Sequence, residues 1–133
     1  MTKEFVPYKL ALALKELGFD EPCFAIHSIN LMTENEDWEL RIGGVWKNQE
    51  LVDSIKAPTF SQAFRWFREK YKLYPEIGLH DREDEKTWRL TISILGYYEL
   101  AYNQNVGKEP YYKTYEETES ACLIKLIEIV KTK

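Results

Sequence analysis

Three segments of the chain begin in the same way and continue with the spacing of an α-helix. Each places Pro or Thr before an aromatic residue and a small residue one turn later: Pro7-Tyr8-x-x-Ala11, Thr59-Phe60-x-x-Ala63 and Thr114-Tyr115-x-x-Thr118. Thr is a good N-cap because its hydroxyl accepts a hydrogen bond from the first turn, and Pro suits that turn because it has no N–H to leave unpaired. Apolar residues then recur with helical period, and Gly18 marks a natural stop. The pattern predicts three helices.

Between these helices, apolar and polar residues alternate, which is the period of a β-strand with one buried face. One alternating stretch covers 38–42 and another covers 88–94. Each has an apolar partner stretch upstream, at 24–26 and 77–79, across a polar link of hairpin length. Keeping apolar residues on one face predicts the register. The predicted pairs are Ile26 opposite Leu40, His27 opposite Glu39, Leu79 opposite Trp88 and His80 opposite Thr87.

The predicted elements form two copies of a helix–hairpin unit followed by a closing helix. Corresponding residues are 50 to 53 positions apart: Tyr8 and Phe60, His27 and His80, Trp38 and Trp88. Units this small cannot bury their apolar faces alone, so we expect them to share one sheet or two abutting sheets. The predicted fold is α+β, ordered α-ββ-α-ββ-α, with the helices packed on one face of an antiparallel sheet. We predict a single domain over 1–133, with pseudo-repeats at about 5–56 and 57–113, a closing helix at 114–131 and an added short hairpin within 97–113.

Composition narrows the class of protein. The chain has 133 residues, of which 44% are hydrophobic, which is enough for one core and excludes a disordered chain. No apolar run approaches the roughly 20 residues of a membrane span and no export signal is present, so we expect a cytoplasmic protein without membrane association. The net charge of −4 argues against nucleic acid as a partner. Two distant cysteines, Cys23 and Cys122, are expected as reduced thiols, with a disulfide as the alternative.

The sequence carries no recognised catalytic or metal-binding motif. Glycine-rich phosphate loops, a nucleophile elbow and paired metal-ligand spacings are all missing from it. We therefore predict no catalytic residue, no metal and no cofactor, although an enzyme stays an open alternative. That alternative depends on a polar cluster of His27, Glu39 and His80 on the sheet, in which His27 and Glu39 form an acid–base pair or the two histidines share a metal. Ordinary, partly exposed histidines are the competing interpretation.

Aromatic residues outside the predicted core suggest a partner surface. Trp66 falls off the apolar stripe of its helix, and Trp46 follows two glycines in a segment without clear period. Trp and Arg are enriched where interfaces carry most of their binding energy. The candidate surface comprises Trp46, Trp66, Arg65, Arg68, Tyr97, Tyr98 and Tyr102, unless neighbouring segments cover these residues. The sequence predicts a non-enzymatic module that binds a protein partner or itself. The alternative is a nucleic-acid-associated accessory protein that uses the basic face around 65–72.

Three strings extend this interpretation: ELGFDEPC at 16–23, APTFSQAFRWFREKY at 57–71 and TYEETESACLIKLIEIV at 114–130. With them, nearly the whole chain resembles a family of short uncharacterised proteins of Bacteroides-like gut bacteria and their phages and mobile elements. Members often have Ala where this chain has Thr118, and Gly where it has Lys72. The resemblance implies a cytoplasmic, phage-related accessory protein. It supplies no activity, cofactor or site residue.

Overall fold

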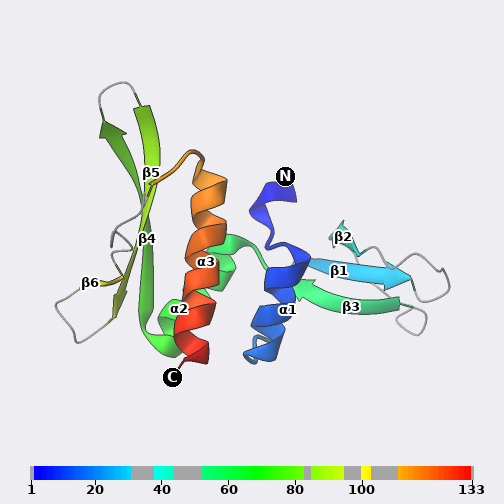
Figure 1. Ribbon diagram of the computed structural model, residues 1–133. Coiled ribbons are helices and arrows are strands. Elements are labelled where there is room, and N and C mark those ends of the chain that lie inside the picture. Colours follow the sequence, from blue (N-terminus) through cyan, green and yellow to red (C-terminus); the bar gives the residue numbers. More distant parts are fainter. Residues whose placement is uncertain are drawn as a thin grey trace. The chain divides into compact units, whose positions relative to one another are not determined.

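The computed structural model describes residues 2–30, 38–43, 52–82, 85–94, 100–102 and 111–132. Within these residues the fold is a mixed α+β arrangement of three α-helices, a short 3-10 helix and two antiparallel sheets (Figure 1). The predicted α+β class is confirmed. The chain divides into two compact units, Met1–Ser61 and Gln62–Lys133, which we describe separately as unit 1 and unit 2. A single domain with two pseudo-repeats stays a prediction.

Unit 1 contains one α-helix and a three-stranded sheet. Its elements are η1 (Thr2–Glu4), α1 (Tyr8–Glu16), β1 (Ala25–Asn30), β2 (Glu39–Ile42) and β3 (Val52–Ala57). The strand order is β2-β1-β3, so β1 is the central strand, and α1 packs against β3. The sequence pattern predicted β1 and β2 as a hairpin but missed β3. The buried apolar residues of unit 1 include Phe5, Val6, Ala11, Leu14, Phe19, Ala25, Ile55 and Ala57.

The C-terminal end of α1 is closed by a glycine in the left-handed region. Gly18 has φ +101°, which residues with a Cβ rarely adopt. Its N–H donates to the carbonyl of Lys15 at 3.0 Å, and the N–H of Phe19 donates to the carbonyl of Leu14 at 3.0 Å. These bonds satisfy carbonyls that a helix end leaves unpaired, and they bring Phe19 back onto the core beside Leu14. The predicted stop at Gly18 is confirmed.

Unit 2 contains a long hairpin, two short strands and a closing helix. Its elements are α2 (Phe60–Tyr71, which begins at the end of unit 1), β4 (Leu73–Arg82), β5 (Glu85–Ile94), β6 (Leu100–Tyr102), β7 (Tyr111–Tyr112) and α3 (Tyr115–Lys131). Strands β6 and β7 both pair with β5. The additional hairpin expected within 97–113 is therefore replaced by two short strands on β5. Helix α3 packs along β5 and β4, and both strands reach beyond the start of α3 (Figure 1).

The three predicted helix starts are confirmed. In α3 the Thr114 hydroxyl accepts a hydrogen bond from the N–H of Glu117 at 3.1 Å, as expected for an N-cap. Pro7 occupies the N-cap of α1, one position before the first turn. The small residue that follows each first aromatic is buried in all three helices, with exposures of 1% for Ala11, 0% for Ala63 and 0% for Thr118. Small side chains at these positions allow each helix to pack closely.

The predicted register is confirmed in the second hairpin and wrong in the first. Leu79 lies opposite Trp88 and His80 opposite Thr87, as expected. In the first hairpin, His27 lies opposite Leu40 instead of Glu39, a shift of one residue. Such a shift exchanges the two faces of the strand. The cause is that Ala25 and His27, not Phe24 and Ile26, face the buried side, where small alanines let Phe5 pack closely.

The residue after α2 offers a test of helix termination. Lys72 has φ +57°, a left-handed conformation that costs a residue with a Cβ roughly 1 kcal/mol. We expect Lys72→Gly to raise the free energy of unfolding by about 1 kcal/mol, since glycine adopts this conformation without strain. Glu69→Gly, on an exposed position inside the same helix, should lower it by about 1 kcal/mol. Urea denaturation of both variants measures the two changes, and equal signs would contradict the interpretation.

Candidate functional site

His27 is a buried structural residue in unit 1. Its side chain is 7% exposed, and its Nε2–H donates a hydrogen bond to the carbonyl oxygen of Val6 at 2.7 Å. The carbonyl can only accept, so the proton lies on Nε2. The ring of Tyr8 meets the imidazole edge-on, with centroids 6.1 Å apart, and stacks on Trp38 at 4.4 Å. His27 thus holds the segment before α1 on the sheet.

The predicted polar cluster does not form around His27. The observed register places Glu39 opposite Ser28, so Glu39 and His27 lie on opposite faces of the sheet. The Glu39 carboxylate is exposed and lies 3.8 Å from the guanidinium of Arg41. His80 belongs to β4, and its side chain lies outside the described residues. Among the described residues, no three His, Cys, Asp or Glu side chains are close enough together to hold a metal ion.

The predicted partner surface is only partly visible in the structure. Trp66 is buried, with 7% exposure, so it is not the exposed anchor that its position off the helical stripe suggested. Its ring meets Phe67 and Tyr71 edge-on, and the Lys70 ammonium lies 5.1 Å from its centroid. Arg65 is exposed and Arg68 half-buried. Trp46, Tyr97 and Tyr98 lie outside the described residues, as does the side chain of Tyr102 in β6.

A surface that the sequence did not single out is an apolar patch on unit 2, which we define as Leu79, Trp88 and Tyr115. Leu79 and Trp88 are cross-strand partners on β4 and β5, so their side chains share one face. Tyr115, the first residue of α3, meets the Trp88 ring edge-on with centroids 5.1 Å apart. Leu79 is 53% exposed and Tyr115 is 40% exposed, while Trp88 is half-buried. The patch is therefore an exposed continuation of the hairpin's buried face.

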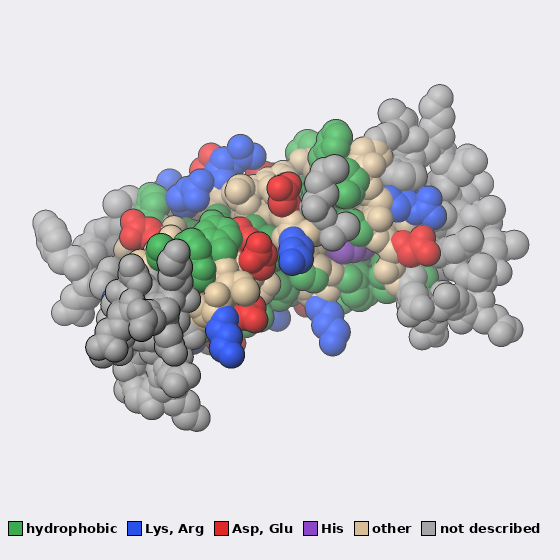
Figure 2. Space-filling model, turned by 90° about the horizontal axis from the view of Figure 1, so that it is seen from above, with side chains coloured by type: hydrophobic (Ala, Val, Ile, Leu, Met, Phe, Trp, Pro, Cys, Tyr) green, Lys and Arg blue, Asp and Glu red, His purple; other side chains and the backbone are tan. Residues whose placement is uncertain are grey.

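The apolar patch has an acidic border. Glu116 and Glu117 occupy the first turn of α3 and are exposed. Partial burial raises the pKa of Tyr115, and the negative charges of Glu119 and Glu116 raise it further. Figure 2 shows hydrophobic side chains at the surface next to acidic ones. The electrostatic surroundings of the patch favour a positively charged neighbour.

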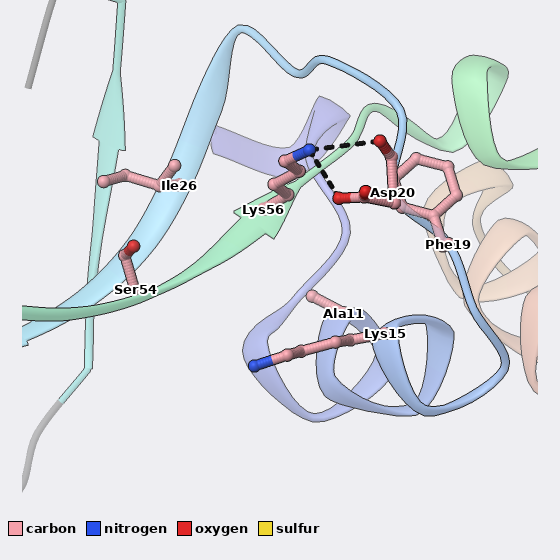
Figure 3. A pocket seen from close by; sticks show the side chains of 7 residues that line it. All are labelled: Ala11, Lys15, Phe19, Asp20, Ile26, Ser54 and Lys56. Carbon is pink, nitrogen blue, oxygen red and sulfur yellow. Dashed lines mark hydrogen bonds and ion pairs between the residues drawn. The ribbon is translucent and has the colours of Figure 1, made fainter.

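Unit 1 contains a pocket of about 260 Å³ lined by residues from α1, the loop after it, β1 and β3. The lining residues are Ala11, Lys15, Phe19, Asp20, Ile26, Ser54 and Lys56 (Figure 3). The Lys56 ammonium bridges to Asp20, at 2.8 Å from its carboxylate Oδ1 and 3.1 Å from its carbonyl. This hydrogen bond, together with the charge of Lys56, lowers the pKa of Asp20 from its usual value. Asp20 is therefore a carboxylate at neutral pH.

Both cysteines are reduced and form no disulfide, as expected. Cys122 of α3 is fully buried, and this burial, together with the charge of Glu119, raises its pKa to about 12. Cys23 lies half-buried on the loop before β1, and its thiol donates a weak hydrogen bond to the carbonyl of Glu21 at 3.4 Å. Burial and a raised pKa make Cys122 unsuited to act as a nucleophile.

Comparisons with protein-family models, with curated proteins and with solved structures found no match to this chain. No helix among the described residues combines the length and the apolar character needed to cross a membrane.

The role of His27 can be tested by stability. We expect His27→Leu to lower the free energy of unfolding by about 1–3 kcal/mol, because the buried carbonyl of Val6 would lose its donor. His27→Gln, whose amide can donate from a similar position, should retain a larger part of the stability. Urea denaturation compares the two variants. If both were as stable as the parent protein, His27 would not anchor the N-terminal segment.

The two thiols should differ sharply in reactivity. With a pKa of about 12, only roughly one Cys122 in ten thousand is ionised at pH 8, and burial blocks access. We expect an aromatic disulfide reagent to modify one thiol rapidly in the folded protein and two in urea. Cys23→Ser should abolish the rapid reaction, whereas Cys122→Ser should leave it intact. A rapid reaction that survives in Cys23→Ser would contradict the burial of Cys122.

Proposed function

We propose that this protein is a non-enzymatic interaction module that binds a protein partner through the apolar patch of unit 2. The observation that carries the proposal is the exposure of Leu79 and Tyr115 around a half-buried tryptophan. Tryptophan and tyrosine in partly desolvated positions are typical of the residues that dominate binding energy. Trp88 is held in place from beside by Tyr115, so little side-chain entropy is lost when a partner covers it.

The chemistry of the border selects the partner. The exposed carboxylates of Glu116 and Glu117 adjoin the patch. A partner that presents an apolar side chain flanked by Lys or Arg complements this surface. A second copy of this chain would place carboxylates against carboxylates, which opposes self-association through the patch. We therefore assign the patch to a basic, apolar protein segment.

A nucleic-acid-associated role, the alternative from the sequence, is less well supported. It needs an aromatic residue exposed beside basic ones, so that bases can stack. Trp66, the aromatic residue on the basic helix face, is buried. The acidic border of the patch would also repel phosphates.

Only the resemblance to the family described above bears on the origin and the cellular setting of the protein. We propose a cytoplasmic, phage-related accessory protein built from a duplicated helix–hairpin unit. Two observations support the duplication. A small residue one turn into each helix is buried, and the tryptophan of each predicted hairpin contacts the first residue of a helix. Trp38 stacks on Tyr8, which precedes it in the chain, whereas Trp88 meets Tyr115, which follows it. This difference in chain order leaves the duplicated plan and the packing of all helices on one sheet face as proposals.

Selection from a library of random displayed peptides tests the proposed function. We expect the whole protein to enrich peptides that carry an aromatic residue or Leu between Lys or Arg residues. A synthetic peptide of the enriched sequence should bind with at least about ten-fold lower affinity to Leu79→Asp, since an anchor at the centre of an interface typically carries this much energy. Glu116→Lys should weaken the binding of the same peptide, because charge complementarity is lost. Fluorescence of a labelled peptide measures both affinities.

A matched control lies on the other unit. Phe24 is an apolar side chain that is 72% exposed on unit 1, so Phe24→Asp removes a similar exposed apolar surface from the other unit. This variant should bind the peptide as the parent protein does. The proposal would be overturned by enrichment of acidic peptides, by peptide binding that survives Leu79→Asp, or by a dimer in light scattering that Leu79→Asp dissociates. Salt-sensitive binding of short oligonucleotides in place of peptides would favour the alternative.

A further inference from the structure

The pocket in unit 1 has an apolar floor and a charged rim. Ala11 and Phe19 are almost fully buried and Ile26 is half-buried, so these three residues form the floor. Lys15 and Asp20 are exposed at the rim. Ile26 and Lys56 are cross-strand partners, which places their side chains on one face of the sheet, opposite the face of His27. An apolar floor with a few polar groups at its edge is typical of small-molecule sites.

The charges around the pocket sum to a positive value. Lys56 is matched by Asp20, which holds it at 2.8 Å (Figure 3). Lys15 then supplies a second ammonium on the α1 side of the pocket, and within the described part of the chain no carboxylate forms an ion pair with it. The carbonyls of Ala13, Leu14 and Lys15 at the C-terminal end of α1 accept backbone hydrogen bonds, which reduces the negative partial charge that they present to this ammonium. The pocket therefore favours a negatively charged group.

The size of the pocket limits the ligand. A volume of about 260 Å³ corresponds to about nine water molecules and is just below the roughly 300 Å³ at which sites for drug-sized ligands begin. One aromatic ring or a short aliphatic chain fills the floor, and one anionic group reaches the rim. We propose that this pocket binds a small organic carboxylate, with its apolar part against Phe19 and Ile26 and its carboxylate near the Lys15 ammonium. The proposed function does not depend on this site, because the apolar patch belongs to unit 2.

Phenylacetate is a suitable probe, because it joins one ring to one carboxylate. We expect it to shift the amide resonances of Lys15, Ser54 and Lys56 in proton–nitrogen NMR spectra of the whole protein. Phenylacetamide, its neutral analogue, and phenethylamine, its cationic analogue, should bind more weakly or not at all. Lys15→Gln should lower the affinity for phenylacetate about ten-fold, since it removes the charge while keeping a helix-forming residue. Asp20→Asn should strengthen phenylacetate binding, because it removes the negative charge that offsets Lys56.

Lys9→Gln provides the matched control. Lys9 is an exposed residue of α1 that does not line the pocket, so this variant should bind phenylacetate as the parent protein does. Equal affinity for phenylacetamide would overturn the proposal, because charge would then play no role. Equal losses in Lys9→Gln and Lys15→Gln would overturn it as well, because they would show general attraction of anions. Amide resonance shifts confined to residues of unit 2 would also overturn the proposal. The absence of any shift at millimolar phenylacetate would do the same.

Discussion

The length of each helix limits how much of its sheet it can cover, and most other features of the two units depend on this constraint. In unit 2, α3 has 17 residues and extends about 25 Å, while the ten residues of β4 extend about 33 Å. The apolar face is buried at Leu90 and Ile92, under the helix, and becomes exposed at Leu79. In unit 1, α1 has only nine residues, and the segment before it covers the face of the sheet that carries His27. The exposed patch follows from this mismatch in length.

Local signals in the sequence were sufficient for the helices and for the second hairpin. Capping residues and helical spacing act within one or two turns, so the starts at Tyr8, Phe60 and Tyr115 could be predicted. The first hairpin failed because its apolar pattern is ambiguous: Phe24 and Ile26 looked like the buried set, whereas Ala25 and His27 are buried. Their burial depends on two segments that are distant in the sequence. One is β3, whose sequence has no clear period, and the other is the N-terminal segment, whose Phe5 packs with Ala25 and Ala57. Such long-range contacts leave no periodic signal.

The candidate site was less predictable than the fold for a related reason. The helical wheel of α2 suggested that Trp66 is exposed, but α2 buries residues around more than one side, and Trp66 is among them. The register placed Leu79 beside Trp88 correctly, yet alternation alone assigned both to the core. Whether an inward-facing strand residue is covered depends on where the helix above it begins. That position follows from the connection through β7, which was not predicted as a strand on β5.

The two proposed surfaces differ in charge, which the net charge of the whole chain conceals. A balance of −4 suggests an acidic protein, yet the pocket of unit 1 has one more cation than anion because Asp20 is already engaged by Lys56. The patch of unit 2 has an acidic border because the first turn of α3 contains Glu116 and Glu117, whose charges also offset the positive end of the helix dipole. Stabilisation of the helix start and the proposed selection of a basic partner therefore depend on the same carboxylates in unit 2. Removing or reversing these charges changes folding and binding together, so the affinity of Glu116→Lys is interpreted only beside its free energy of unfolding.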